Sequence, residues 1–138
     1  MGEKGVRSTL AASLAEALYR QRRYEEAEYF ARAGLEAASP EDVASQALGR
    51  MVAAKLLAVR GTGDRAERTA REAVALAEQT DDLFTRGQSN LALAKVLLLA
   101  DRRKEAIEAL EAAVEASDRK GNIVSADRAR ALLTELER

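Results

Sequence analysis

Apolar residues recur at steps of three and four positions along almost the whole chain, and β-branched residues never alternate with polar ones. This spacing predicts amphipathic α-helices and no β-strand. The clearest unit spans residues 81–117, where a mostly apolar helix is followed by a polar turn and a second amphipathic helix. Neither helix can bury its apolar surface within this hairpin alone, so we expect neighbouring hairpins to complete the burial.

The whole chain divides into three such hairpins and one further helix. The hairpins are expected at about residues 8–38, 41–79 and 82–119, and the last helix at about residues 122–137. A chain of 138 residues is long enough to bury a core without a metal ion or a disulfide. The predicted fold class is therefore an all-α solenoid of seven helices, a single domain over residues 1–138 with a C-terminal capping helix.

The ends of several helices are marked by residues that favour capping. Ser39 followed by Pro40 would begin the third helix, because proline at a first helical position loses no hydrogen bond. Gly61 would end that helix in a left-handed conformation. Gly121 would end the sixth helix, and Asn122 would cap the seventh.

Inward and outward faces can be assigned on individual helices. The first helix is expected to begin at Ser8 or Thr9, either of which can act as its N-cap. Its inward stripe would consist of Leu10, Leu14, Ala17 and Leu18. On the outside of the fourth helix, opposite charges four positions apart predict two ion pairs, Asp64 with Arg68 and Glu67 with Arg71.

A repeat close to forty residues long appears when the sequence is aligned with itself. In the second helix of each hairpin, small residues coincide, with larger residues beside them. The matching sets are Ala27, Ala66 and Ala106; Ala31, Ala70 and Leu110; Gly34, Ala73 and Ala113; and Leu35, Val74 and Val114. Because small residues let helix backbones approach closely, we expect these positions where the two helices of a hairpin cross.

The small-and-large pattern of each hairpin, such as Leu93, Ala94 and Leu97 followed by Ala106, Leu110 and Ala113, resembles the tetratricopeptide repeat. The period exceeds the family's usual length of about thirty-four residues, so the chain is similar to its long-helix variants. The early aromatic residue of the family is replaced by Ala11, Arg50 and Asn90. The resemblance implies a right-handed superhelix in which the first helix of each hairpin lines a concave groove.

Several short stretches carry a closer resemblance. They are residues 5–11, 17–19, 23–28, 42–46, 54–55 and 119–122. These stretches resemble the C-terminal repeats of large bacterial proteins that join a class III adenylate or guanylate cyclase domain to an ATPase module. The resemblance implies that this chain is the regulatory repeat region of a bacterial signalling protein, without the catalytic parts.

Composition excludes several classes of function. The chain has no cysteine and no histidine, so it lacks thiolate nucleophiles, disulfides and the commonest general base, and the missing thiols agree with a cytoplasmic location. The 22 basic and 23 acidic residues are mixed, without the basic stripe that nucleic acid requires. Lys55 and Lys95 interrupt the most apolar segments, so no membrane span is expected. We therefore predict no enzyme, no cofactor and neither a nucleic-acid nor a membrane partner.

Three kinds of motif could carry chemistry, and each also has a plainer structural explanation. Acid pairs at two helix starts could bind a metal ion, but their repeat-related positions favour helix capping. A Gly-Thr-Gly turn resembles part of a phosphate loop but lacks its strand and its Gly-Lys ending. Basic clusters could hold an anion or form solvated helix faces. The motifs are Glu41-Asp42 and Asp81-Asp82; Gly61-Thr62-Gly63; and Arg102-Arg103-Lys104 with Arg128 and Arg130.

The first helices of the hairpins carry the strongest candidate site. The resemblance implies that one stripe on these helices faces the groove and binds a partner helix or peptide. The predicted groove residues are Tyr19, Leu48, Met51, Val52, Lys55, Leu91, Lys95, Leu98 and Leu99, with Ala12, Glu16, Val59 and Gln88 beside them. The alternative is that some of these side chains are buried between neighbouring hairpins.

The predicted function is a non-catalytic scaffold for protein interaction or self-association through this groove. Its partner would be another protein, a peptide or a second copy of the chain in a homodimer. Lys55 and Lys95 would select acidic partners. The alternative function is a module that senses a peptide or a small ligand bound in the same groove.

Overall fold

The computed structural model describes the backbone of residues 2–120 and 123–137 and the side chains of residues 8–119 and 127–136. This part of the chain forms seven α-helices and no strand. They are α1 (Gly2–Arg20), α2 (Tyr24–Ala37), α3 (Val43–Val59), α4 (Gly63–Glu78), α5 (Leu83–Leu99), α6 (Arg103–Lys120) and α7 (Ile123–Glu137). The predicted all-α fold is confirmed. The predicted stop at Gly121 and cap at Asn122 lie outside the described residues.

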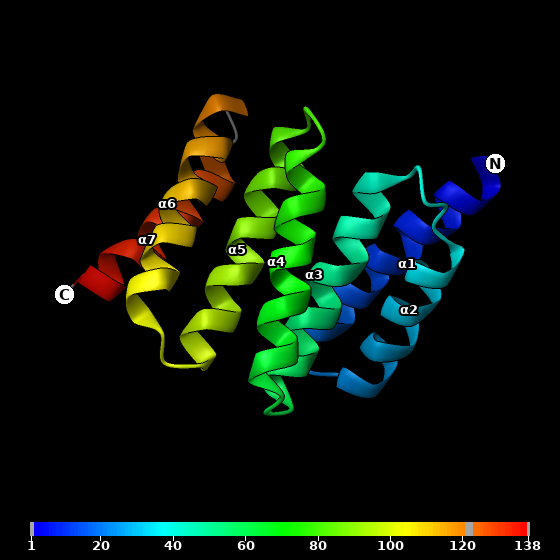
Figure 1. The fold of residues 1–138 in the computed structure, drawn as a ribbon, viewed down its shortest axis with the longest axis horizontal. Helices are drawn as coiled ribbons and strands as arrows, with labels where there is room; N and C mark the ends of the chain where they lie inside the picture. The colour runs from blue at the N-terminus through cyan, green and yellow to red at the C-terminus, as the bar shows by residue number, and fades with distance from the viewer. Residues whose placement is uncertain (1, 121–122, 138) are drawn as a thin grey trace.

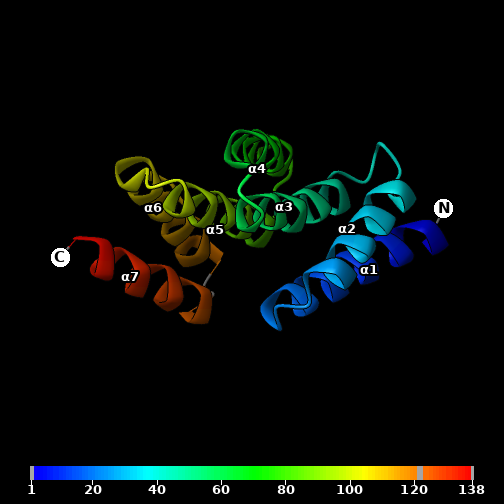
Figure 2. The ribbon, with the colours of Figure 1, turned by 90° about the horizontal axis from the view of Figure 1, so that it is seen from below.

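The helices pair into three antiparallel hairpins, α1–α2, α3–α4 and α5–α6, which follow one another along the long axis of the molecule (Figure 1). The second helix of each hairpin also contacts the next first helix, and α3 lies between α1 and α5. Seen from below, the row is an arch with α4 on its convex side and α1 and α7 at its two ends (Figure 2). The main contacts join consecutive hairpins, which is the arrangement of a solenoid.

The three hairpin turns share one backbone geometry. Arg22, Gly61 and Asp101 occupy equivalent places close to forty residues apart, and all three are left-handed, with φ values of 63°, 85° and 60°. After each one, an amide N–H donates to a leucine carbonyl of the preceding helix at 2.9 Å: Arg23 to Leu18, Thr62 to Leu57 and Arg102 to Leu97. This is the Schellman arrangement that ends a helix, so the predicted stop at Gly61 is confirmed.

The repeated small residues lie where the helices of a hairpin meet. Ala27, Ala66 and Ala106 are completely buried. At the crossing of α1 and α2, a methyl group added to Gly34 would lie only 3.1 Å from the carbonyl oxygen of Ser8. A larger side chain at that position would therefore push the two helices apart.

The first helix differs from its prediction. Because α1 begins at Gly2, Ser8 lies inside the helix and is buried instead of capping it. Two leucines of the predicted inward stripe are on the surface, since Leu10 is 63% and Leu14 43% exposed. The inward face consists of Ser8, Ala12, Ala15 and Leu18. The predicted stripe is right at Leu18 and wrong at Leu10, Leu14 and Ala17, which lie outside the main contacts of α1 with α2 and α3.

The start of the third helix also differs from its prediction. α3 begins at Val43, and neither Ser39 nor Pro40 is part of it. The cap is Asp42, whose carboxylate accepts a hydrogen bond from the amide of Ser45 at 3.2 Å. A carboxylate provides the cap and complements the positive end of the helix dipole at once.

Candidate functional site

Residues of α1, α3 and α5 line a groove. These three helices lie on the concave side of the arch, away from α4 (Figure 2). Its cavity has a volume of about 640 Å³. The wall formed by α3 and α5 is largely apolar, whereas the wall formed by α1 and its end is largely polar. The apolar wall contains Leu48, Met51, Val52, Phe84 and Ala92, the polar wall contains Thr9, Ser13, Glu16, Arg20 and Gln21, and Ala12, Ala17, Lys55 and Gln88 complete the lining.

Equivalent positions of the repeat meet in this groove, so that one stripe of each first helix faces it. The equivalent sets are Thr9, Leu48 and Gln88; Ser13, Val52 and Ala92; and Glu16, Lys55 and Lys95. All of these residues except Lys95 line the cavity. The shared stripe is the reason that helical spacing in the sequence could locate much of the groove.

Lys55 lies in the floor of the groove and is only 6% exposed. Its ammonium pairs with the carboxylate of Glu16 on α1 and lies 4.7 Å from the centre of the Tyr19 ring. Burial lowers the pKa of Lys55, and the pairing with Glu16 offsets only part of this effect. Burial alone would raise the pKa of Glu16, but Lys55 and a hydrogen bond from Arg20 at 2.9 Å lower it below its usual value.

Lys95 is the equivalent of Lys55 on α5, but no described carboxylate pairs with it as Glu16 pairs with Lys55. It is half-buried, and within the described part of the chain its ammonium forms no hydrogen bond or ion pair. Burial lowers the pKa of Lys95, and repulsion by Lys55 lowers it further. Glu16 attracts Lys95 without contacting it, so among the described residues Lys95 is a partly desolvated cation without a direct ion pair.

Only some of the nine predicted groove residues line the cavity. Leu48, Met51, Val52 and Lys55 line the cavity, and the ring of Tyr19 lies beside Lys55. Leu91 is buried in the core, and Leu98 packs against the same core. Met51 and Val52 line the cavity but are only 5% and 3% exposed and belong to core clusters, so the alternative of burial between hairpins applies to all four residues. Leu99 is exposed and Lys95 is half-buried, and both lie outside the lining. Of the four residues predicted beside them, Ala12, Glu16 and Gln88 line the cavity and Val59 does not.

Phe84 is the most prominent groove residue that the sequence analysis missed. It lies in the first turn of α5, lines the cavity and is 42% exposed. Phe84 precedes Gln88 by four positions, so its spacing places it on the predicted stripe. Arg20, which follows Glu16 by four positions, could have been found in the same way.

The acid pairs and the Gly-Thr-Gly stretch take part in ordinary helix ends. Asp82 caps α5, accepting a hydrogen bond from the amide of Phe84 at 3.0 Å and one from the Thr85 hydroxyl at 2.7 Å. The stretch Gly61-Thr62-Gly63 forms the turn between α3 and α4. In the described residues, no group of three or more metal-ligating side chains is placed to hold a metal ion. None of the described helices combines the length and apolar character needed to cross a membrane.

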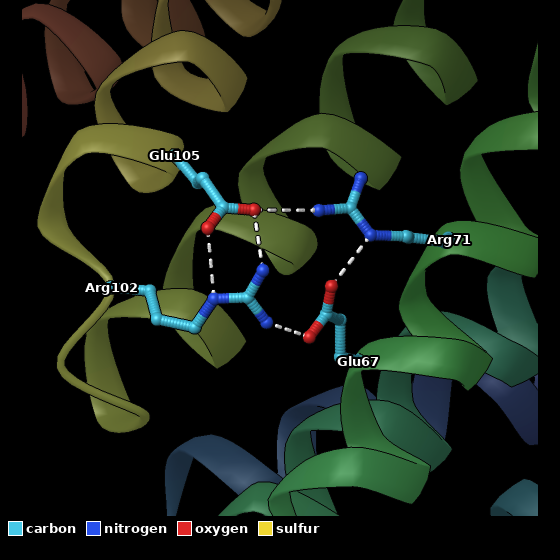
Figure 3. A network of polar contacts seen from close by, with 4 residues as sticks. All are labelled: Glu67, Arg71, Arg102 and Glu105. Carbon is cyan, nitrogen blue, oxygen red and sulfur yellow. Dashed lines mark hydrogen bonds and ion pairs between the residues drawn. The ribbon is translucent and has the colours of Figure 1, made fainter.

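On the convex side, four side chains form a charge ring between α4 and the start of α6 (Figure 3). Glu67 accepts a hydrogen bond from Arg71 at 2.8 Å and pairs with Arg102. Glu105 accepts from Arg102 at 2.9 Å and from Arg71 at 3.2 Å. The hydrogen bond from Arg71 is the main cause of a lowered pKa of Glu67. The predicted pair of Glu67 with Arg71 is thus present, whereas no pair of Asp64 with Arg68 occurs among the described side chains.

A second cavity, of about 430 Å³, lies between the first two hairpins. We call it the outer crevice. Its floor is apolar, and charged groups surround it. The floor consists of Ala31, Leu35, Ala53, Leu56 and Leu57, and the rim of Glu28, Arg32, Arg60, Thr62 and Arg65.

Comparison of the chain with protein-family models, with curated proteins and with solved structures finds no match. The groove, the outer crevice and their charges are therefore the observations from which a function can be inferred.

Proposed function

We propose that this protein is a non-catalytic interaction module, similar to a tetratricopeptide repeat domain, that binds an amphipathic α-helix of a partner protein in its concave groove. The observation that carries the proposal is the exposed Phe84 within a groove that has one apolar and one polar wall. An amphipathic helix presents an apolar stripe and a polar face, which match these two walls. Leu48 and Phe84 would supply the apolar contacts, because both retain accessible surface.

Charge favours an acidic partner. Lys55 is already neutralised by Glu16, so Lys95 is the cation that an incoming carboxylate would meet. Pairing would compensate the burial of Lys95, and a desolvated cation gains more from such a pair than an exposed one does. We therefore assign the selection of acidic residues to Lys95, with Arg20 at the opposite wall.

The biological setting rests on the resemblance of several short stretches to the repeats of bacterial cyclase and ATPase signalling proteins. On that basis the module is the regulatory part of a larger signalling protein, and its groove docks a helix that belongs to another part of the pathway. No residue of the chain is assigned a catalytic role.

A displayed library of helical peptides tests the proposal. Peptides are selected on the wild-type protein, and the survivors are compared on Phe84→Glu and Lys95→Glu. Both positions are accessible, and an acid in the first turn of α5 suits the helix dipole, so the variants should fold. The matched controls are Tyr29→Glu and Lys104→Glu, which replace an aromatic residue and a lysine with glutamate at exposed positions outside the groove.

The expected survivors are acidic amphipathic helices that bind both controls as they bind the wild type and lose at least tenfold in affinity for Phe84→Glu in the groove and for Lys95→Glu beside it. A library without enriched sequences, or survivors that bind these two variants unchanged, would reject the proposal. Light scattering adds a distinction. A dimer that Phe84→Glu dissociates would show that the occupant is a second copy of the chain and not a different protein.

A further inference from the structure

The contacts between consecutive hairpins on the convex side differ in charge, although they occupy equivalent positions of the repeat. Ala27, Ala66 and Ala106 are equivalent, so the residues around them correspond as well. The charge ring between the second and third hairpins consists of Glu67, Arg71, Arg102 and Glu105. The equivalent residues between the first and second hairpins are Glu28, Arg32, Thr62 and Arg65, which lie on the rim of the outer crevice.

The charge ring is neutral, but the rim of the outer crevice is not. Arg65 stands where the ring has Glu105, so an acid is replaced by a base. The single carboxylate of the rim, Glu28, is shared by Arg32 at 3.1 Å and Arg60 at 2.6 Å. Arg65 forms no hydrogen bond or ion pair with any side chain that the structure describes. Three guanidinium groups therefore surround one carboxylate, and the crevice has an excess of positive charge.

The shape of the outer crevice suits a small molecule. Its volume of about 430 Å³ falls within the range of small-molecule pockets, roughly 300 to 1,000 Å³. Its floor is formed by alanine and leucine side chains, with charged groups confined to the rim. A ligand with an apolar body and one anionic group would match both parts.

We propose that the outer crevice is a binding site for a small organic acid. Its carboxylate lies between Arg60 and Arg65, and its apolar body rests on Leu35 and Leu57. In the charge ring the carboxylate of Glu105 accepts hydrogen bonds from two arginines, so a carboxylate is the group missing from the equivalent rim. The planar fork of a guanidinium matches the two oxygens of a carboxylate. This site is separate from the concave groove and does not depend on the function proposed for it.

Sodium octanoate is the probe for this site, with octanol as the neutral analogue and octyl phosphate as the alternative anion. Binding is measured by titration of backbone amide signals in NMR spectra and by the shift in melting temperature, because a ligand of the folded form raises stability. We expect octanoate to perturb amides of α2 and of the α3–α4 turn, and to bind at least tenfold more tightly than octanol.

Variants of the rim give the decisive comparison. Arg65→Glu restores the acid that the charge ring has at Glu105, and we expect it to weaken octanoate binding at least tenfold. Thr62→Arg combined with Arg65→Glu rebuilds the whole ring and should abolish binding while it retains the helical circular dichroism signal. The matched control is Arg68→Glu, the same change on the same helix at an exposed residue outside the crevice, which should bind octanoate as the wild type does.

Several results would overturn the proposal. They are the absence of any response to octanoate, a response that Arg65→Glu leaves unchanged, equal binding of octanol, and perturbations confined to α1 and α5 around the concave groove. Tighter binding of octyl phosphate than of octanoate would overturn the assignment of a carboxylate. Binding of octanoate that Arg65→Glu weakens and Arg68→Glu preserves would support the site.

Discussion

Charged side chains link neighbouring hairpins on both sides of the arch, but in different surroundings. In the concave groove one pair joins α1 to α3, and its side chains are only 7% exposed for Lys55 and 26% for Glu16. On the convex side four groups share their charges between α4 and α6, with exposures from 22% for Glu67 to 48% for Arg71. Water screens the outer groups and is nearly excluded from Lys55.

These different surroundings determine how much stability is lost when one charged partner is removed. A buried ion pair contributes little net stability, yet removal of one member leaves the other desolvated and uncompensated. An exposed pair contributes at most about 1 kcal/mol, and the remaining member is simply hydrated by solvent. The inner contact should therefore be sensitive to single substitutions and insensitive to salt, and the outer contact should show the opposite behaviour.

The largest effect is expected from Glu16→Gln. It leaves the ammonium of Lys55 buried without a counter-charge, which should cost about 3 kcal/mol in the free energy of unfolding, measured by urea denaturation. Lys55→Met added to this variant should recover most of the loss, because no charge then remains in the floor of the groove. A cost below about 1 kcal/mol, or no recovery in the double variant, would contradict the assigned role of burial.

A smaller effect is expected from Lys95→Met, which removes an unpaired and half-buried ammonium. It should raise stability by about 1 kcal/mol at neutral pH, whereas Lys104→Met on the surface should not. The pKa of Lys95 is lowered in the folded chain, so the unfolded chain holds the proton more strongly, and the contribution of Lys95 to stability rises with pH between that lowered pKa and about 10. The advantage of Lys95→Met should shrink over this range. An advantage that is independent of pH would contradict the desolvation of Lys95.

The smallest effect is expected from Glu67→Gln in the charge ring, about 0.5 to 1 kcal/mol at low ionic strength and almost nothing in about 1 M salt. The pKa of Glu67 is lowered by folding, so its contribution is present above about pH 4.3 and is lost as the pH falls through the lowered pKa. Glu111→Gln, at an exposed position of α6 without an ion pair among the described side chains, is the control. If Glu67→Gln loses as much stability in high salt as in low salt, the ring is better shielded from solvent ions than its exposure indicates.

Much of the fold could be predicted because its determinants are local in sequence. Helical spacing located the seven helices, and the coincidence of Ala27, Ala66 and Ala106 revealed the repeat. Gly61 identified one turn because glycine favours positive φ, but Arg22 and Asp101 adopt the same conformation without such a signal. At these two positions the close packing of the hairpin imposes the left-handed conformation, although the residue carries a side chain.

The errors have a different origin. Leu10 and Leu14 have the spacing of a buried stripe, and only the absence of a packed neighbour in the structure shows that they are exposed. In the groove, the sequence could place Glu16 and Lys55 on equivalent stripes, but their pairing joins residues 39 positions apart and depends on how closely α1 approaches α3. Pairings across hairpins cannot be derived from the spacing within a helix.

Each hairpin is closed by its own turn and packs mainly on the next, so the molecule can be lengthened by one hairpin at a time. An in-frame duplication of residues 43–82 would add one further α3–α4 unit whose faces match those already present on either side. The arch would gain a step, and small-angle scattering would record the longer particle. A single genetic event would thus extend the concave surface and broaden what it can accommodate, while the existing hairpins retain their internal packing.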